Sequence, residues 1–559
     1  MLHPYSTGRP NTIPSFPVFL PSSPLQDSPS PLIIQAWGRH LSLYPGNLQR
    51  NIIGILKFGC QIGADLEIEL LSQKNQASTA ANTVLISEKI SADLDIGRIA
   101  MATSPVMSSP LGLVPKADGG WRRIHNLSSP SGRSVNDSIP IAFATLQYST
   151  VDQVLQHVIH AGRSCIIVKR DIKDAFRNIP LSIEAQRLMG FSWKGVVYFE
   201  RCLSFGLRTA PFLFNLFAEG FHWILIQHIP NAALEHYLDD FIFILSDASI
   251  LPQLLSVYNQ LSDELGIPRN ESKNIEGTTA EVLGYIIDTL KFELRLSPSK
   301  QATTIEEIDK ALSGRSLTLV QSQKLAGRLA WSARVIRLGR SYNRSIWEFI
   351  STFTKAGGYP RRRLTAELRQ DLLWWRDALT LSNGILFFDD TDRKQFHLFS
   401  DASGILGYGA FFFLEDSRGT TWPPYSVSLP QDDSLSCYPN AEHRLALINE
   451  REVRAITTSF QLWATRWEHS SVCIHTDNTV ALSGFQNTVV KGPGNYPLRE
   501  ILQLAAAYDI TLYAEWVSSA ENGLADALSR FDRDRVLLLC PHWDTSDLPL
   551  PYASLLHLI

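Results

Sequence analysis

Cysteine is scarce in this sequence, and its few copies lie far apart. The 559 residues contain six cysteines, and no two of them form a Cys-x-x-Cys pair. Zinc knuckles and disulfide-linked small domains need closely spaced cysteines, so neither is expected. The spacing suits a protein of a reducing compartment.

Long apolar segments are also missing. The stretch 221–229 is short and is interrupted by Gln227 and His228, whereas a membrane-spanning helix needs about 20 apolar residues. The amino terminus lacks the charged and then apolar pattern of a secretory signal. These absences predict a soluble, intracellular protein, located in the cytoplasm, the nucleus or both, that has no membrane partner.

The chain has no overall positive charge, but one segment does. The net charge is -4, whereas nucleic-acid-binding proteins commonly present a basic surface. Residues 300–363 contain 13 Lys and Arg against four acids, a local charge of +9. Several of these arginines recur every three to four residues, so we expect them to share one helix face and to grip the phosphates of a duplex. A solvated face is the alternative, although it would normally contain more acids. The candidate nucleic-acid-binding residues are Arg328, Arg334, Arg337, Arg340 and Arg344.

The composition that is present predicts several folded domains. Apolar residues make up 45% of the chain and charged residues 19%, which is typical of globular proteins. Alternating strand-like and helical runs predict a multi-domain α/β (α+β) fold. The expected parts are a flexible leader (1–31), a helical N-terminal region (32–95), an α/β region (96–298), a helical region (299–390), a second α/β domain (391–535) and an unassigned tail (536–559).

Acidic residues interrupt strand-like runs in the first α/β region. Asp171 ends one such run, and Asp239 and Asp240 stand within YLDDFIFIL, the pattern of a β-hairpin with acids at its turn. Carboxylates on neighbouring strands can hold two divalent cations for nucleotidyl transfer. We expect Asp171 and Asp239 to be the main ligands and Asp240 an auxiliary acid. For the pair alone, two solvated acids at a turn would be the simpler interpretation.

These acids belong to an ordered series of motifs. The series is SPLGLVPKADGGWRRIHNLSSPSGRSVNDSIP (109–140), DIKDAF (171–176), LSFGLRTAPFLFN (203–215), YLDD (237–240) and LGYIIDT (283–289). It resembles the motif series of reverse transcriptases and is most similar to that of DIRS-like and gypsy-type retrotransposons. The resemblance extends roughly over residues 35–535. It implies right-hand polymerase fingers and palm in 96–298 and a helical thumb and connection in 299–390.

The resemblance also implies residues that contact the triphosphate. Lys116 and Arg122 would bind the incoming nucleotide, with Arg123 as the alternative if the register differs by one. A point charge and a fork-shaped donor suit that task. Lys273 matches a proposed general acid for the departure of pyrophosphate. Ordinary surface cations are the alternative for all of them.

Two further motifs match contacts to the sugar and the base. Phe176 would pack under the sugar of the incoming nucleotide, and Phe205 and Gly206 would lie behind the nascent base pair. A core phenylalanine is the alternative for Phe176.

Four acids fall at spaced positions of the second α/β region. Asp401 and Asp477 follow strand-like runs, and Glu452 and Asp526 lie in helical ones. The order resembles that of ribonuclease H, which implies that the four carboxylates hold two ions that activate water and polarise a phosphate. Glu450 is the alternative to Glu452. The loop WVSSAEN (516–522) lacks a histidine that many relatives carry, which puts efficient product release in doubt.

Taken together, the resemblance implies an RNA- and DNA-templated DNA polymerase with ribonuclease H activity that serves retrotransposon replication. Its cofactor would be Mg²⁺ or Mn²⁺, two ions per active site. Its partners would be an RNA template, a DNA primer, an RNA–DNA hybrid and deoxynucleoside triphosphates. A domesticated or inactive copy that only binds nucleic acid is the alternative, disfavoured by the complete set of acids. An RNA-dependent RNA polymerase is disfavoured by the second domain and by Phe176.

Overall fold

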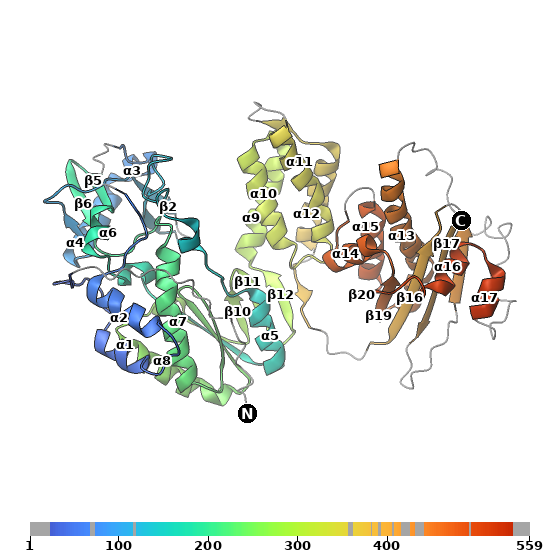
Figure 1. Cartoon of the computed structure of the whole chain (residues 1–559), viewed down its shortest axis with the longest axis horizontal. Helices are drawn as coiled ribbons and strands as arrows, with labels where there is room; N and C mark the ends of the chain where they lie inside the picture. Colours follow the sequence, from blue (N-terminus) through green and yellow to red (C-terminus); the bar gives the residue numbers. More distant parts are fainter. Residues whose placement is uncertain are drawn as a thin grey trace. The chain divides into compact units, whose positions relative to one another are not determined.

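The structure is a computed structural model, and it describes ten stretches of the chain. They are 23–66, 73–115, 119–355, 361–381, 383–388, 393–404, 407–414, 425–430, 441–490 and 494–539. The chain divides into two units, Met1–Glu293 and Leu294–Ile559, and each mixes helices with sheets (Figure 1). The expected multi-domain α/β class is confirmed.

The first unit contains eight described α-helices and eleven strands. Its helices are α1 (Ile34–His40), α2 (Leu48–Phe58), α3 (Ala77–Ala80), α4 (Thr83–Asp95), α5 (Val151–Ala161), α6 (Ile183–Arg187), α7 (Ala210–His228) and α8 (Leu251–Leu265). Its strands are β1 (Ile99–Met101), β2 (Leu111–Pro115), β3 (Trp121–His125), β4 (Ile166–Asp171), β5 (Gly190–Trp193), β6 (Val196–Glu200), β7 (Ala233–Tyr237), β8 (Asp240–Leu245), β9 (Ile275–Gly277), β10 (Thr279–Val282) and β11 (Tyr285–Asp288).

A four-stranded antiparallel sheet forms the centre of this unit. Its strand order is β7-β8-β4-β9, so β4 lies between β8 and β9. The residues Phe241–Leu245 of β8 are all buried, which is why this apolar run forms an inner strand. The sheet brings the end of β4 beside the start of β8.

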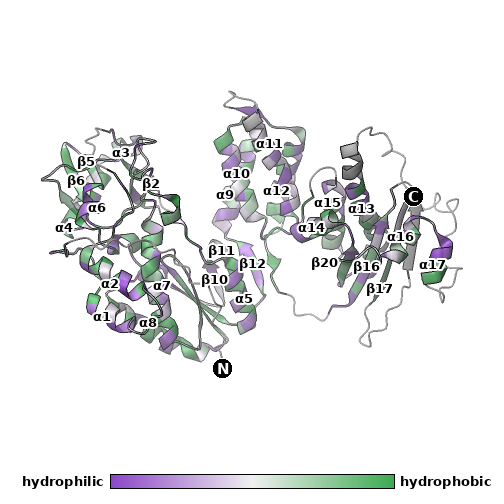
Figure 2. Ribbon diagram, viewed as in Figure 1, coloured by the Kyte–Doolittle hydropathy of each residue, from purple (hydrophilic) through white to green (hydrophobic). Residues whose placement is uncertain are grey.

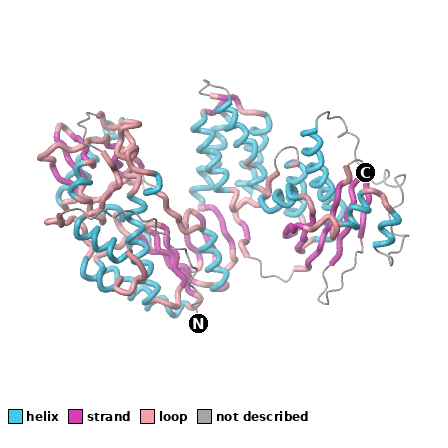
Figure 3. The backbone as a smooth tube through the Cα atoms, viewed as in Figure 1, coloured by secondary structure: helices cyan, strands magenta, loops and turns pink. Residues whose placement is uncertain are grey.

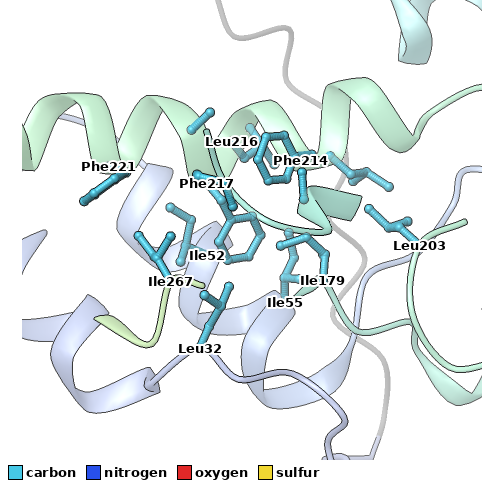
Figure 4. Close-up of a cluster of buried hydrophobic side chains, with 14 of the residues drawn as sticks. Leu32, Ile52, Ile55, Ile179, Leu203, Phe214, Leu216, Phe217, Phe221 and Ile267 are labelled. Carbon is cyan, nitrogen blue, oxygen red and sulfur yellow. The ribbon is translucent and has the colours of Figure 1, made fainter. Parts of the chain in front are cut away.

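Helix α7 packs against the N-terminal helices in one shared core (Figure 4). Trp37 of α1 lies edge-on to Phe217, and Ile52 of α2 belongs to the same cluster as Phe221. The Trp37 indole also donates a hydrogen bond of 3.0 Å to the Leu265 carbonyl. Within the predicted helical region 32–95, α1 and α2 therefore bury their apolar faces against the α/β region.

The second unit begins with a helical segment. Its elements are β12 (Glu293–Leu296), which enters from the first unit, α9 (Pro298–Ser313), β13 (Ser316–Leu317), α10 (Leu319–Ser332), α11 (Arg344–Lys355), β14 (Arg362–Arg363), α12 (Ala366–Leu381) and β15 (Ile385–Leu386). Helix α10 starts with a capping box in which Thr318 and Gln321 each bind the other's backbone N–H. Figure 2 shows hydrophilic residues along α9 and α10, as expected for helices with one face in water.

A five-stranded sheet follows in the same unit. Its elements are β16 (Gln395–Ala402), β17 (Gly407–Leu414), β18 (Tyr425–Pro430), α13 (Ala441–Trp463), β19 (Ser471–Thr476), α14 (Thr479–Asn487), α15 (Asn495–Ala507), β20 (Thr511–Trp516), α16 (Gly523–Ser529) and α17 (Arg533–Leu539). The strand order is β18-β17-β16-β19-β20. Figure 3 draws the strands in magenta and the helices in cyan. The β16–β19 and β19–β20 pairs are parallel, and the β16–β17 and β17–β18 pairs are antiparallel.

The helical segment and the five-stranded sheet domain share a buried ion pair. Arg499 of α15 pairs with Asp371 of α12 at 3.0 Å and donates a 2.6 Å hydrogen bond to the Ser341 carbonyl. The Arg499 guanidinium also lies 4.1 Å from the centre of the Tyr342 ring. The two regions that the sequence separates at residue 390 are thus held together within one unit.

Among the described residues, no helix is both long enough and apolar enough to cross a membrane.

The shared core gives a stability prediction. Replacing Trp37, which is 1% exposed, with alanine leaves a cavity between α1 and α7 and should reduce the free energy of unfolding by about 3–5 kcal/mol. Urea denaturation of the full chain measures the change. Leu43→Ala, at a side chain that is 84% exposed, is the matched control and should change stability by less than about 0.5 kcal/mol. Equal small effects of both substitutions would mean that α1 does not contribute to the core.

Candidate active sites

The first carboxylate cluster lies where β4 meets the β7–β8 hairpin. Asp171, the last residue of β4, is the register partner of Asp240, the first residue of β8. Tyr237 also pairs with Asp240, so Leu238 and Asp239 form a two-residue turn. Leu238 has φ 52°, a conformation that costs energy for a residue with a branched side chain. The fold therefore places all three predicted acids at one sheet end.

Two of these carboxylates, Asp239 and Asp240, have raised pKa values. Burial raises the pKa of Asp239 to about 6, and the charges of Asp240 and Asp171 add to the increase. Burial also raises the pKa of Asp240, although Lys169 opposes this with an ion pair of 2.9 Å. Like charges repel, and a divalent cation bound by these carboxylates would offset the repulsion that, after burial, raises the pKa of Asp239 and Asp240. Three carboxylate donors suit a hard divalent cation.

Two polar residues fix the orientation of Asp171. Asn270 donates a hydrogen bond of 2.8 Å to its Oδ1, and the Lys273 ammonium lies 2.7 Å from its Oδ2. Burial lowers the pKa of Lys273, but the hydrogen bond to Asp171 and the nearby acids outweigh this and raise it. The structure therefore places the predicted Lys273 in contact with the cluster. Asn270 and Lys169 were not singled out in the sequence, where single polar residues give no signal.

An aromatic cluster in the same unit contains Phe176 and Phe205. The Arg122 guanidinium is 4.2 Å from the centre of the Phe205 ring, and the Phe205 and Phe176 rings are 5.2 Å apart. Gly206 has φ 113°, and a Cβ there would lie 1.9 Å from the His125 carbonyl oxygen, so only glycine fits. The structure thus brings these four predicted residues together with one another. Lys116 lies outside the described residues.

Arg123 serves a different purpose from Arg122. Its guanidinium pairs with Asp93 at 2.7 Å and with Glu200 at 2.7 Å, and Arg177 contacts the same two acids at 3.3 and 2.6 Å. Burial opposes the charge of Glu200, but Arg123 and Arg177 outweigh it and lower the Glu200 pKa to about 2. Arg123 is therefore committed to a buried four-residue network, and Arg122 is the arginine available to a ligand.

The same network holds the turn that carries Phe176. Arg177 is the next residue along the chain and is buried, with its guanidinium fixed between Glu200 and Asp93. The Phe176 backbone is thus tied to α4 and β6 through its neighbour. A ring held in this way can act as a rigid contact surface.

The second carboxylate cluster lies in the five-stranded sheet domain. Asp401 of β16, Glu452 of α13 and Asp477 after β19 each offer an oxygen within 4.8 Å of the other two. Glu452 is 6% exposed, and its Oε2 has no hydrogen-bond partner. Burial, followed by the charges of Asp401 and Asp477, raises the Glu452 pKa well above its usual value. An orphaned buried carboxylate oxygen beside two acids fits a cation ligand.

The structure places Glu452 in the cluster rather than Glu450, and Asp526 lies near the cluster. Glu450 accepts hydrogen bonds from Arg454 at 3.0 and 3.1 Å and is absent from the set of three acids. Asp526 pairs with Arg530 and Arg535, each at 2.6 Å. Burial raises the pKa of Asp401, and the nearby charge of Asp526 adds to the increase. In the loop that lacks histidine, Ser519 donates a 2.7 Å hydrogen bond to Asp477.

The predicted arginine stripe does not form one helix face. Helix α10 ends at Ser332, and Arg334, Arg337 and Arg340 lie between it and α11, which begins at Arg344. The expectation of one continuous helix was wrong, because α10 ends seven residues before Gly339 and the chain then packs tightly, so that a Cβ on Gly339 would lie 2.4 Å from the Trp375 ring. Arg328 remains within α10.

Two of these arginines have intramolecular partners in the same unit. Arg337 donates a 2.9 Å hydrogen bond to the Ile510 carbonyl, and Arg344 pairs with Glu348 at 2.5 Å. Arg340 is exposed. The spacing of the charges therefore does not by itself define a phosphate-binding surface.

The comparison with protein families matches part of the first unit. Residues 114–287 match a family model described as "Reverse transcriptase (RNA-dependent DNA polymerase)". This segment contains Asp171, Asp239 and Asp240. The chain thus carries a segment similar to the polymerase domain of reverse transcriptases.

Curated retroviral polyproteins are also similar to the chain. The Pro-Pol polyprotein of Simian foamy virus type 1 is 27% identical over 213 residues, which covers 36% of this chain and 17% of the polyprotein. The Gag-Pro-Pol polyprotein of Sheep pulmonary adenomatosis virus is 24% identical over 268 residues, which covers 45% of this chain and 14% of the polyprotein. The chain therefore spans only a small part of the length of these relatives.

Solved structures of a foamy viral protease-reverse transcriptase are similar at low identity. One, in complex with double-stranded DNA, has a TM-score of 0.49 and 17% identity and covers 88% of this chain and 82% of its own. Another, in complex with an RNA/DNA hybrid, has a TM-score of 0.46 and 19% identity and covers 87% and 63%.

The repulsion in the first cluster gives a pH-dependent prediction. The pKa of Asp239 in the folded protein is above that of the unfolded chain, so stability is lost as the pH rises through about 6. Without divalent cations at about pH 7.5, Asp239→Asn should therefore raise the free energy of unfolding by about 1–3 kcal/mol. The gain should vanish at about pH 4, where Asp239 is protonated in the folded wild type.

Chemical denaturation of both proteins at the two pH values, with chelator present, measures this difference. The wild type at low pH is the internal control, since the same side chains are compared with and without the charge. A gain that is equal at both pH values would show that repulsion is not its cause.

Proposed function

We propose that this chain is an RNA- and DNA-templated DNA polymerase, a reverse transcriptase, that also cleaves the RNA strand of RNA–DNA hybrids. The observation that carries the proposal is the meeting of Asp171, Asp239 and Asp240 at one sheet end, within the segment that matches the reverse transcriptase family. The three acids Asp401, Glu452 and Asp477, which share one site in the second unit, support the nuclease part.

The polymerase site would work through its carboxylates. Asp171, Asp239 and Asp240 would hold two divalent cations, Mg²⁺ or Mn²⁺, which supply a lowered pKa for the primer hydroxyl and charge stabilisation for the leaving pyrophosphate. Asn270 and Lys273 keep the Asp171 carboxylate in one orientation. Lys273 is 54% exposed at its side chain, so its ammonium is also open to an anionic leaving group.

Arg122 and the aromatic cluster would bind the nucleotide. Arg122 is held over Phe205 and is not engaged in the buried network that occupies Arg123, so it is suited to a triphosphate. Phe176, packed between Phe205 and Phe214, would lie under the sugar. Phe205 and Gly206 would lie behind the base pair. Lys116 is proposed as a second triphosphate contact on the motif resemblance alone.

The second unit would supply ribonuclease H activity. Asp401, Glu452 and Asp477 would hold cations, with Asp526 as the fourth acid, and the bound ions would supply an activated water and a polarised phosphate. Arg530 and Arg535 pair with Asp526, so Asp526 would have to give up one or both ion pairs to bind a cation.

The biological setting is part of the proposal. The partners would be an RNA template, a DNA primer, the hybrid they form and deoxynucleoside triphosphates. The motif series favours a retrotransposon of the DIRS-like or gypsy type, and the scattered cysteines favour an intracellular location. Arg328, Arg334, Arg337, Arg340 and Arg344 are retained as candidate phosphate contacts, although they do not share a helix face.

Selective loss of each activity tests the two-site proposal. Asp239→Asn should abolish primer extension on a homopolymer RNA template but leave hybrid cleavage, because the two carboxylate clusters belong to different units. Asp477→Asn should abolish hybrid cleavage and leave extension. Both products are measured in one reaction with Mg²⁺ or Mn²⁺.

The exposed substitution Glu88→Gln in α4 is the control and should leave both activities unchanged. Loss of both activities in either active-site variant, in protein that keeps its melting temperature, would contradict the assignment of one site to each unit. A wild type that binds hybrid but shows neither activity would favour the inactive, nucleic-acid-binding alternative.

Nucleotide selection gives a second test. The Phe176 ring is fixed by Phe205, Phe214 and the anchored Arg177, so it can exclude a 2′-hydroxyl by occupying its space. Phe176→Val should raise ribonucleotide relative to deoxyribonucleotide incorporation at least about tenfold, or about 1.4 kcal/mol. Competing single-nucleotide incorporation measures the ratio, and a melting curve checks folding. A parallel loss of both activities with an unchanged ratio would identify a core phenylalanine only.

A further inference from the structure

Three nitrogen and sulfur donors meet on one face of the five-stranded sheet. His397 on β16 is the register partner of Cys473 on the parallel neighbour β19, and His475 follows two residues later on β19. Side chains alternate between the two faces of a strand. Leu398, Val472 and Ile474 belong to the core under α13, so His397, Cys473 and His475 share the opposite face.

The three donors are close together and largely shielded from water. One ligand atom from each lies within 4.8 Å of the other two. Cys473 is 2% exposed and His475 7%. The His397 Nδ1 and the His475 Nε2 are 2.8 Å apart, so one of the two nitrogens donates a hydrogen bond to the other.

One atom of this group has an unmet requirement. The Nδ1 of His475 is buried and has no hydrogen-bond partner. Leaving a buried polar atom without a hydrogen bond is unfavourable for folding. The nearest carboxylate is that of Glu515, the register partner of His475 on β20, whose Oε2 lies 4.0 Å away. A proton on Nδ1 that points toward Glu515 leaves Nε2 as a lone-pair donor.

We propose that His397, Cys473 and His475 bind one divalent transition-metal ion of the Zn²⁺ class. Two imidazoles and a thiolate suit Zn²⁺ or Co²⁺ and are poor ligands for Mg²⁺, so this site differs in chemistry from both carboxylate clusters. On binding, the Cys473 thiol releases its proton to solvent, and the two imidazole nitrogens move apart to about 3.3 Å, as tetrahedral ligands do at about 2.0 Å from the metal.

Glu515 has the position of an outer carboxylate in this arrangement. A metal-bound histidine almost always donates its second N–H to a carboxylate, carbonyl or water, which fixes its tautomer and its ring orientation. Closing the 4.0 Å gap between His475 Nδ1 and Glu515 would supply that hydrogen bond. Glu515 is exposed, so its side chain can move without disturbing the core.

The bound ion would link β16 to β19. β16 carries His397 and then Asp401, and β19 carries His475 and leads to Asp477. An ion bound across these strands would fix their register just before the two acids. The bound metal is therefore a structural element, and the inference does not depend on the proposed nuclease activity.

The test is a cobalt titration of the full chain. Protein is freed of metals by a chelator and then titrated with Co²⁺ in the presence of excess Mg²⁺, which occupies the carboxylate clusters. We expect a thiolate-to-cobalt charge-transfer band that saturates at one ion per chain and disappears when Zn²⁺ is added. Zn²⁺ should also raise the melting temperature of the wild type, because it binds the folded state.

Matched variants identify the ligands. Cys473→Ala should lose the band, whereas Cys165→Ala, at another buried thiol, should keep it. Glu515→Gln should weaken Co²⁺ binding about 10-fold to 100-fold, and Glu468→Gln, at another exposed glutamate of this domain, should not. If Cys473→Ala fails to fold, His397→Gln provides the same loss of affinity at a half-buried position. No band with the wild type, or a band that persists without Cys473 or His397, would overturn the proposal and leave a hydrogen-bonded histidine pair.

Discussion

The placement of like charges in buried positions is the constraint on which the rest of this structure depends. Asp239 and Asp240 are held beside Asp171, and Glu452 beside Asp401 and Asp477, so burial and mutual repulsion raise the pKa of several of these acids. Such clusters are unfavourable for folding on their own. They persist only where a rigid scaffold holds them, and here the scaffold is a sheet end in each unit.

Several independent contacts hold the backbone around the first cluster in place. The turn residue Leu238 keeps a left-handed backbone conformation because β7 and β8 are paired on both sides of it and its side chain packs on the core. Lys169 and Lys273 supply positive charge to Asp240 and Asp171. The protein thus tolerates the cluster through backbone pairing and neighbouring cations.

The sequence predicted those features that depend on order along the chain. The positions of Asp171, Asp239, Asp401 and Asp477 at strand ends follow from strand-like runs that end in an acid, and the structure has strands there. Features that depend on tertiary packing were missed. The arginine stripe is interrupted where α10 ends at Ser332, the helices α1 and α2 join the main core, and His397 meets Cys473 only through parallel pairing of distant strands. The Cys-x-His spacing of β19 was the one local signal for the last of these.

The buried network of Asp93, Arg123, Arg177 and Glu200 has a consequence for how this sequence can vary. Each arginine touches both acids, so loss of any one member strands a charge in the interior at a cost of about 3–5 kcal/mol. The members come from four separate segments of the chain, and two of them adjoin Arg122 and Phe176. In related sequences, the four residues should therefore be kept or replaced together. Substitutions at the neighbouring positions 122 and 176 should be limited to those that leave the network intact.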